Sequence, residues 1–372
     1  MIYLDNSATT KPFDSVLDAV CASYKEDFYN ISSPYSKALD TEKKMLSAKK
    51  IIAKALNITD KELIFTSGGT ESDNTALNLA KDNSEVIVSA YEHHAILNCE
   101  EFLKKRNIKV IYCPVNSEGI VEKETLKNLV NENTSLVSIM HVNNEIGAIN
   151  DIASLVKAVK EKNPHTLFHS DGVQAFMHVC TDMKELGVDL YSVSAHKIHG
   201  PKGIGALYIR KSVPYYPFIY GGGQQYNLRS GTVNVPSIIG FAKAVEELES
   251  LNIIDKLQNV KSRYKELLSS VPDTIFNIED SAPNILSVTF KGVKASSLQN
   301  AVEDKVIIGK GSACTSRSSK VSHVLEAINI PLPLAESTVR ISFGAFNTLE
   351  EAEIACEHIK EKVQYLRKFK RK

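Results

Sequence analysis

The sequence predicts an α/β protein with a large, mostly parallel sheet and a second, smaller α+β domain. Between about residues 60 and 210, seven short apolar segments alternate with amphipathic helical stretches, which is the pattern of repeated βαβ units. After residue 270 this alternation ends, and strands and helices follow in a less regular order. A chain of 372 residues is long enough for two domains. We expect the large domain over residues 13–255 and the small one over 1–12 together with 256–372.

The expected strands of the large domain are short apolar runs, and the segments between them have helical periodicity. One helix is expected from about 71 to 80 and another from 152 to 160, where Ile152, Leu155 and Val159 recur at helical spacing. A long helical segment, roughly 236–269, then separates the two regions. The seven strands are expected at residues 62–66, 85–89, 109–113, 136–141, 166–170, 190–194 and 204–209.

The small domain is predicted from fewer elements. A run of small polar residues around Cys314 is too polar for a core and is expected to form a loop of this domain. Its strands are expected at 284–290 and 337–342, and its helices at 295–303, 319–328 and 349–366.

The composition is ordinary for a globular protein. Hydrophobic residues make up 43% of the chain, and 44 basic residues balance 44 acidic ones, which argues against nucleic-acid binding as the main role. No apolar stretch approaches 18 residues and no signal peptide is visible, so we expect no membrane span. The six cysteines form no C-x-x-C pair, which predicts reduced thiols in the cytoplasm, with neither disulfides nor a metal site.

Short polar clusters follow four of the expected strands. They lie at residues 67–70, 143–145, 171–174 and 194–197. Because ligands of open α/β sheets bind at the carboxyl ends of the strands, we expect these four clusters to share one site.

The first cluster contains Gly69 and Thr70 at the expected start of a helix. Backbone N–H groups at such a position bind phosphate, although a tight strand-to-helix turn requires glycine in any case. In the last cluster, Lys197 is either a solvated charge or a lysine that forms a Schiff base in a shielded pocket. Ser194 and His196 beside it could then hold a phosphate.

Other polar residues allow a structural and a functional interpretation. Asp171 follows an expected strand, where it can cap a turn or keep a pyridine nitrogen protonated. Gln174 could donate to a phenolic oxygen of the same ring. His93 and His94 are either structural, or one of them stacks on the ring and transfers protons with an ordinary pKa of roughly 6.5.

The cysteines are by default small, buried and inert. Cys314 is the one that we expect in a loop, between Lys310 and Arg317, which would favour its thiolate. We therefore interpret Cys314 as either an exposed liability or a reactive nucleophile.

Taken together, these motifs resemble the cysteine desulfurases of the NifS/IscS type, within the class V aminotransferase group of fold-type-I pyridoxal-phosphate enzymes. The resemblance covers nearly the whole chain. It is carried by nine blocks in the family order: YLDNSATT, FTSGGTESDN, EHHA, HVNNEIG, HSDGVQA, SAHKIHGPKGIGALY, RSGTVN, GSACTS and STVRISFG, from Tyr3 to Gly344.

The resemblance implies a role for each matched residue. Lys197 would carry the cofactor as a Schiff base and later move the substrate proton, and Cys314 would receive the sulfur. Thr232 would reach the phosphate of the neighbouring subunit's cofactor, which implies a homodimer. The remaining roles are ring pairing by Asp171, contact with the phenolic oxygen by Gln174 and Asn144, phosphate binding by Gly69, Thr70, Ser194 and His196, ring stacking by His93, and substrate binding by Arg340 and Asn144.

The implied activity is conversion of L-cysteine to L-alanine with a persulfide left on Cys314. The sulfur would pass to an acceptor protein, either an iron–sulfur scaffold or a tRNA-thiolation enzyme, without direct contact with nucleic acid. Two alternatives remain. One is a selenocysteine lyase or another class V aminotransferase-type enzyme, and the other is a scaffold without activity.

Three segments depart from the family pattern. The family segment GNPSS-x-His reads here as residues 29–35, Tyr-Asn-Ile-Ser-Ser-Pro-Tyr, without its first proline and its histidine. The usual alanine after the ring-pairing aspartate is Gly172, and Gln225 stands where glutamate is common. These changes put loop geometry and partner choice in doubt.

Overall fold

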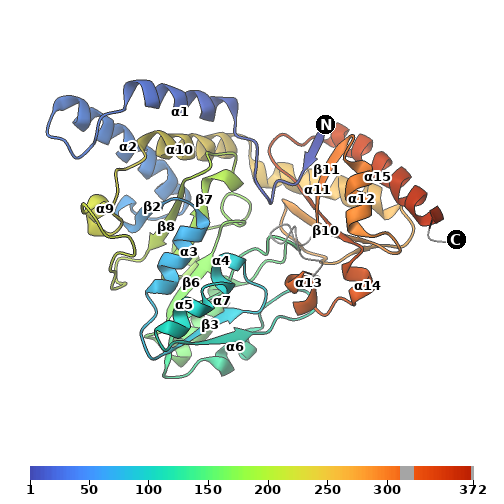
Figure 1. Cartoon of the computed structure of the whole chain (residues 1–372), viewed down its shortest axis with the longest axis horizontal. Coiled ribbons are helices and arrows are strands. Elements are labelled where there is room, and N and C mark those ends of the chain that lie inside the picture. Colours follow the sequence, from blue (N-terminus) through green and yellow to red (C-terminus); the bar gives the residue numbers. More distant parts are fainter. Residues whose placement is uncertain (311–321, 370–372) are drawn as a thin grey trace.

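The computed structural model describes residues 1–310 and 322–369, which form two sheets with helices around them. Figure 1 shows the larger sheet on the left and the smaller one on the right. No helix within these two described ranges is long and apolar enough to cross a membrane.

The larger sheet has seven strands in the order β2-β8-β7-β6-β5-β3-β4. Only β8 runs antiparallel to its neighbours, so the predicted mostly parallel sheet is confirmed. Two carboxyl-terminal boundaries were wrong: the strand expected to reach His141 ends at Ser138, and the strand expected to end before Asp171 includes it. The starts expected at 62, 136, 166 and 204 are at 63, 134, 167 and 205. The strands are β2 (Leu63–Thr66), β3 (Glu85–Ser89), β4 (Lys109–Cys113), β5 (Thr134–Ser138), β6 (Leu167–Asp171), β7 (Leu190–Ser194) and β8 (Gly205–Ile209).

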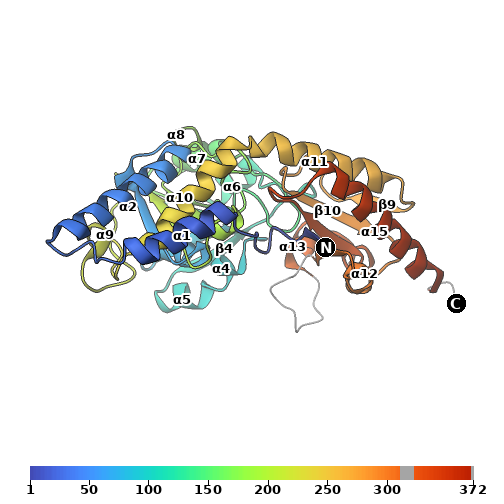
Figure 2. The same cartoon turned by 90° about the horizontal axis from the view of Figure 1, so that it is seen from above.

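Both faces of this sheet are buried. Since side chains alternate along each strand, every strand contributes residues to the core on each face. In β2, Leu63 and Phe65 join the core on one face, while Ile64 joins a separate core on the other. The Ile64 face is covered by α3 (Gly69–Asn78), α4 (His94–Leu97) and α5 (Glu100–Lys105). The opposite face is covered by α2 (Ser36–Ala55), α7 (Ile152–Lys162) and α10 (Val235–Ser250), with α1 (Asp14–Glu26) packed side by side with α10 (Figures 1 and 2).

The smaller sheet has five strands in the order β1-β11-β12-β10-β9. The two expected strands are β10 and β12, and the other three were not predicted. The strands are β1 (Ile2–Leu4), β9 (Thr274–Phe276), β10 (Ile285–Phe290), β11 (Val306–Lys310) and β12 (Thr338–Ser342). The helices that follow α10 are α11 (Ile253–Ser269), α12 (Ala295–Val302), α13 (His323–Ala327), α14 (Leu332–Ala335) and α15 (Leu349–Phe369).

The single long helix expected over 236–269 is wrong. The chain forms α10 and α11 with a break between them, where Asn252 has a left-handed backbone (φ 44°). Asparagine is among the few residues that adopt this conformation readily, so it ends one helical direction and starts another.

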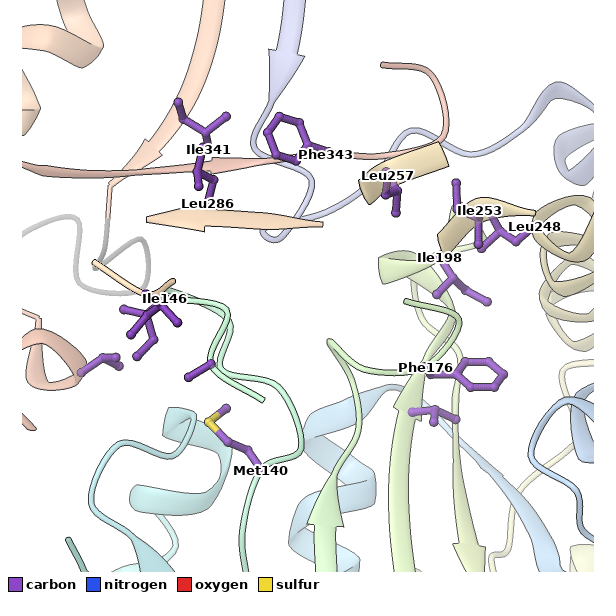
Figure 3. Close-up of a cluster of buried hydrophobic side chains, with 14 of the residues drawn as sticks. Met140, Ile146, Phe176, Ile198, Leu248, Ile253, Leu257, Leu286, Ile341 and Phe343 are labelled. Carbon is purple, nitrogen blue, oxygen red and sulfur yellow. The ribbon is translucent and has the colours of Figure 1, made fainter. Parts of the chain in front are cut away.

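One apolar core runs through both sheets. Figure 3 shows Ile146, which follows β5, between Met140 on one side and Leu286 and Ile341 of the smaller sheet on the other, with Phe343 directly after β12; all five belong to the same buried cluster. The loops after the large sheet are therefore packed against the small sheet, and this junction fixes the position of the site described next.

Candidate active site

A cavity of about 400 Å³ opens where the carboxyl ends of β5, β6 and β7 meet the smaller sheet. Ten of the predicted site residues line it, so the four polar clusters do converge. Thr232 is exposed and does not line the cavity, and Cys314 lies outside the described residues. The predicted residues in the lining are Gly69, Thr70, His93, Asn144, Asp171, Gln174, Ser194, His196, Lys197 and Arg340.

The amine of Lys197 is held by the start of the chain. Lys197 lies in a short 3₁₀ turn (Ala195–Lys197) that directly follows β7. Its Nζ donates hydrogen bonds to the carbonyl oxygens of Ser7 (2.5 Å) and Ala8 (2.9 Å). The Nε2 of Gln174 also donates to the Ser7 oxygen, at 2.9 Å. Residues of the N-terminal segment therefore position the lysine inside the cavity.

The start of α3 provides a cradle for an anion. Gly68 has a backbone that only glycine adopts readily (φ 155°), and a Cβ on Gly69 would lie 2.7 Å from Val173. Ser194 Oγ is buried beside this turn and has no hydrogen-bond partner among the described residues. A buried hydroxyl without a partner is costly, so the arrangement fits a ligand that accepts its hydrogen bond.

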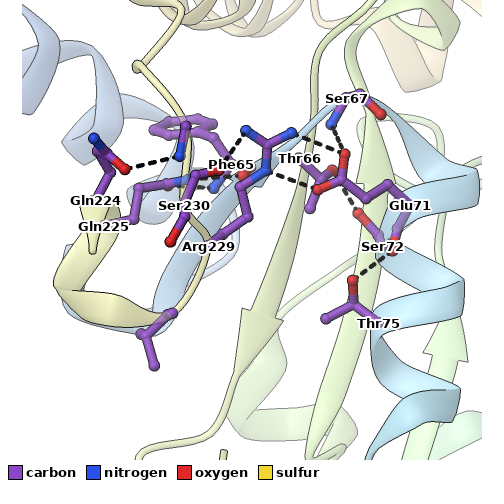
Figure 4. A network of polar contacts seen from close by, with 12 residues as sticks. Phe65, Thr66, Ser67, Glu71, Ser72, Thr75, Gln224, Gln225, Arg229 and Ser230 are labelled. Atoms are coloured by element: carbon purple, nitrogen blue, oxygen red, sulfur yellow. Dashed lines mark hydrogen bonds and ion pairs between the residues drawn. The ribbon is translucent and has the colours of Figure 1, made fainter. Parts of the chain in front are cut away.

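The loop that carries Thr232 is fixed to this same helix. Arg229 makes a two-pronged ion pair with Glu71 of α3, with distances of 2.9 Å and 3.1 Å (Figure 4). Paired contacts of this kind fix orientation as well as distance. Thr232 is exposed on this loop and lies outside the lining of the cavity.

Asp171 is the last residue of β6, and it is a buried residue in the lining of the cavity. Its Oδ1 accepts a hydrogen bond from the N–H of Val173 at 2.9 Å. Burial raises the pKa of Asp171 to about 6, while Lys197 acts in the opposite direction. The following residue explains a departure from the family: a Cβ on Gly172 would lie 2.0 Å from the ring of Tyr191, so this chain has no room for alanine there.

A second carboxylate, which the sequence did not suggest, lines the cavity beside Asp171. Asp73 of α3 is 1% exposed, and its Oδ1 has no hydrogen-bond partner in the described chain. Burial, and then the charge of Asp171, raise its pKa well above the usual range. The Nε2 of His169 lies 3.7 Å from Oδ1 of Asp73, and burial lowers the pKa of this histidine to about 3. Burial and the neighbouring Asp171 therefore both favour the protonated form of Asp73.

His93 lines the cavity as expected, but its predicted pKa is wrong. Burial, followed by the charge of Lys197, lowers the pKa of His93 to about 4. Its Nδ1 accepts a hydrogen bond from the N–H of Ala95 at 3.1 Å, which caps α4. This imidazole is therefore neutral with Nε2 protonated, and it faces the cavity as a flat, uncharged ring.

Glu92, next to His93, is a fully buried acid behind the cavity. Its Oε1 accepts hydrogen bonds from Ser89 Oγ (2.5 Å) and the N–H of Met140 (2.7 Å), whereas Oε2 has no partner among the described residues. Burial raises the pKa of Glu92 to about 8. The carboxyl group thus holds a proton at neutral pH and ties the His93 turn to the end of β5.

We expect Glu92→Gln to remove part of the pH dependence of stability. Because the folded pKa is raised, the proton on Glu92 stabilises the fold at low pH, and this stabilisation is lost as the pH rises from 4.5 to about 8. The free energy of unfolding of the variant, minus that of the parent, should rise by up to about 1.4 kcal/mol per pH unit over this range. Urea unfolding at pH 5 and pH 8 measures the difference. The exposed Glu118→Gln should show no such slope, and a flat difference for Glu92→Gln would contradict a protonated Glu92.

Arg340 of β12 brings the smaller sheet into the site. It is 3% exposed, and its guanidinium donates to Asp5 Oδ1 (2.6 Å) and to the carbonyl oxygen of Asn144 (2.8 Å). Its Nε has no hydrogen-bond partner in the described parts of the chain. Gly309 of β11 leaves the space for this pair, since a Cβ there would lie 2.5 Å from Asp5. The Nε–H of the guanidinium can thus donate to one further anionic group while the other two hydrogen bonds are kept.

Glu145 belongs to the predicted polar cluster 143–145 and lines the cavity, but nothing in the sequence assigned it a role of its own. Its Oε2 accepts a hydrogen bond from Ser322 Oγ at 2.5 Å, and Ser322 caps the start of α13. Burial raises the pKa of Glu145 to about 7, although Ser322 and Arg340 lower it. The two domains expected from the sequence are therefore also linked through this residue.

The expectation for the other cysteines was partly wrong. Cys99, Cys113 and Cys356 are buried, but Cys21 and Cys180 are exposed, and Cys180 also lies in a loop. Loop context alone therefore does not distinguish a reactive cysteine in this chain.

Comparison with known proteins identifies relatives that match nearly the whole chain. Residues 2–354 match the family model described as aminotransferase class-V. The chain is 40% identical over 377 residues to the cysteine desulfurase IscS of Dictyoglomus turgidum, covering 98% of this chain and 95% of the relative.

Solved structures agree with this match. A NifS-like protein superposes with a TM-score of 0.89 at 36% identity, covering 98% of this chain and 99% of that one. The structure of SspA in complex with cysteine gives 0.83 at 30% identity, covering 94% of this chain and all of that one (100%).

Proposed function

This chain belongs to the aminotransferase class-V family, and we propose that it is a pyridoxal-phosphate-dependent cysteine desulfurase. It is an enzyme of the same type as the curated relatives that it matches over nearly its full length. The observation that carries the proposal is one cavity with three features: the amine of Lys197, the carboxylate of Asp171 and the unsatisfied Ser194 hydroxyl beside a glycine turn.

These residues fit pyridoxal phosphate. The turn at Gly69 and Thr70, together with Ser194 and His196, would hold the phosphate, and Lys197 would hold the aldehyde. Asp171 would face the ring nitrogen, His93 would lie on the ring, and Gln174 and Asn144 would contact its phenolic side. The cofactor supplies an electron sink for the bonds broken at the substrate carbons.

Residues of the chain would then remove the Cα proton of cysteine and bind its carboxylate. Lys197, kept in place by the Ser7 and Ala8 carbonyls, would remove the Cα proton when its amine is neutral. Arg340 would bind the substrate carboxylate through the guanidinium edge that Asp5 and Asn144 leave open. The neutral His93 would move protons within the cavity.

Sulfur transfer would be completed by Cys314. Its thiolate would attack the substrate sulfur, so that a sulfur–sulfur bond forms while the carbon–sulfur bond of cysteine breaks. The electron pair of the broken bond stays with the substrate carbon, which takes up a proton, and alanine leaves. The product on the enzyme is a persulfide on Cys314.

We extend the proposal to the setting of the enzyme. Thr232 is exposed on a loop fixed to α3, which suits contact with a second subunit in a homodimer. The persulfide would pass to an acceptor protein for iron–sulfur cluster assembly or thiolation. Scattered cysteines without disulfides among the described residues suit a reducing compartment such as the cytoplasm.

The test is to incubate the purified protein with L-cysteine and a thiol reductant and to measure alanine and sulfide. We expect the two products in equal amounts. Parallel reactions with selenocysteine and with amino-acid and keto-acid pairs identify the rivals: turnover of selenocysteine alone indicates a lyase, and exchange of amino groups indicates an aminotransferase. A colourless protein without turnover would indicate a scaffold.

A further inference from the structure

The N-terminal segment that holds the Lys197 amine has little regular structure of its own. Figure 1 shows it running from β1 in the smaller sheet to the start of α1 beside the larger sheet. Residues 6–13 are a turn followed by irregular backbone, and the carbonyl oxygens of Ser7 and Ala8 in this turn accept hydrogen bonds from Lys197 Nζ. Contacts from elsewhere in the chain must therefore fix the position of these two carbonyl groups.

His199 supplies such contacts with each of its four hydrogen-bonding groups. Its backbone N–H donates to Thr10 Oγ1 (2.7 Å), and its carbonyl oxygen accepts from the N–H of Phe13 (3.3 Å). In the side chain, Nδ1 donates to the carbonyl oxygen of Lys11 (2.7 Å), and Nε2 accepts from the N–H of Ala345, which follows β12 (2.9 Å). Three of the four bonds are to the N-terminal segment, and the fourth joins the same residue to the end of the smaller sheet.

These partners hold the imidazole of His199 in one neutral form. The Lys11 carbonyl oxygen can only accept, so Nδ1 carries the proton, and Nε2 is unprotonated because it accepts from Ala345. The residue is 1% exposed, and burial lowers its pKa to about 4, which agrees with a neutral ring at pH 7. The other neutral form of the ring would lose both bonds.

The backbone at His199 is unfavourable, and the surrounding structure maintains it. Its φ of 64° is left-handed, a conformation that residues other than glycine rarely adopt. Phe13 and Phe346 pack against the ring, with centroid distances of 4.9 Å and 5.4 Å. Gly344 leaves room for the ring, since a Cβ there would lie 2.9 Å from His199 Cε1. Unfavourable backbone that packing maintains in this way is often found at functional sites.

The same segment is bonded on both sides of the lysine. His199 follows Lys197 by two positions, just after the short turn that carries the amine. His196 precedes it, and its carbonyl oxygen accepts from both the N–H (3.0 Å) and the Oγ1 (2.9 Å) of Thr10. Thr10 thus bonds to His196 and to His199, and the turn cannot shift relative to the N-terminal segment without breaking these bonds.

We propose that His199 is a positioning residue for Lys197, because it fixes the N-terminal segment so that the Ser7 and Ala8 carbonyls hold the amine toward the cofactor aldehyde. The inference rests on the proposed function and deepens it. His199 lies outside the cavity lining formed by the described residues, so it acts through the segment and does not touch substrate or cofactor. A histidine that only stabilised the fold would leave the reactivity of the lysine unchanged.

The variants that test this role are His199→Leu and His199→Asn. Leucine removes both side-chain hydrogen bonds, whereas asparagine adopts a left-handed backbone readily and its amide can still donate to the Lys11 carbonyl. We expect the full His199→Leu chain, stripped of cofactor, to take up pyridoxal phosphate at least about tenfold more slowly than the parent, because a small displacement of a reacting group is enough to slow a reaction. His199→Asn should restore most of the rate, which the rise in visible absorption measures.

Hydrogen exchange tests the segment itself, without cofactor. In His199→Leu, the amides of residues 6–13 should exchange at least about tenfold faster than in the parent, while those of β5 and β6 should not, because a buried carbonyl has lost its donor. The matched control is His358→Asn in α15, since His358 is also buried (4% exposed) and its Nε2 bonds Asp304 at 2.8 Å. This control should lower the free energy of unfolding but leave the uptake rate and the exchange of residues 6–13 unchanged.

A His199→Leu protein that takes up pyridoxal phosphate at the parent's rate would overturn the inference, whatever its stability. If His199→Leu does not fold, Thr10→Val replaces it, because this change removes the hydroxyl that accepts from His199 and donates to His196. Uptake at the parent's rate by Thr10→Val would then overturn the inference. A parent chain that takes up no pyridoxal phosphate would contradict the proposed function, and the exchange of residues 6–13 would still show whether His199 fixes the segment.

Discussion

Lys197→Ala should abolish both the visible absorption of the bound cofactor and the formation of alanine from cysteine. The lysine is the amine that the cavity presents, and Ser7 and Ala8 hold it in place. Without it the aldehyde has no covalent attachment and the Cα proton has no base, so we expect a loss of turnover of at least about 10⁴-fold. Absorption spectra and an alanine assay on the purified variant measure the two effects together.

The matched control is Lys202→Ala, which removes an exposed lysine five positions away in the same segment. It should keep the parent's spectrum and most of its activity. A Lys197→Ala variant that still turns over cysteine at the parent's rate would show that another amine binds the cofactor. The assignment of this cavity as the active site would then be wrong.

Cys314→Ala should separate cofactor chemistry from sulfur transfer. Because the cavity residues are untouched, the variant should keep the cofactor's absorption and should still change its spectrum when cysteine is added. Alanine and sulfide should nevertheless fall to background, since no thiolate accepts the sulfur. Spectra with and without cysteine test whether the cofactor chemistry is kept, and assays of alanine and sulfide test whether sulfur transfer is lost.

Cys180→Ala is the right comparison, because Cys180 is also exposed and in a loop. It should leave product formation unchanged. If Cys314→Ala works as well as the parent while Cys180→Ala does not, the persulfide forms on Cys180 instead. Labelled sulfur from cysteine, followed by peptide mapping, would identify the acceptor thiol directly.

The sequence predicted well those features that depend on local patterns. The seven strands of the large sheet are short apolar runs, and the clusters that line the cavity follow them directly. Because ligands of such sheets bind at the carboxyl ends of the strands, Thr70, Asn144, Asp171 and Lys197 were predicted to lie together. The resemblance to a family added Arg340, which no local rule associates with the other residues.

Features that depend on pairing between distant segments were missed. The strand β1 has three residues and pairs with β11 about 300 positions later, so neither is recognisable from its own neighbours. The buried acids Asp73 and Glu92 were missed because an acid within a helix or after a strand normally faces solvent. The pKa of His93 was misjudged for the same reason, since burial is a property of the assembled fold.

The hydrogen bonds from Lys197 to Ser7 and Ala8 have a consequence for synthesis on the ribosome. The segment that holds the amine is made well before β11, yet the strand just before it pairs with β11, which follows only after some 300 further residues. Until then the amino-terminal residues have no sheet to join. A nascent enzyme should therefore be unable to take up its prosthetic group until β11 has been translated.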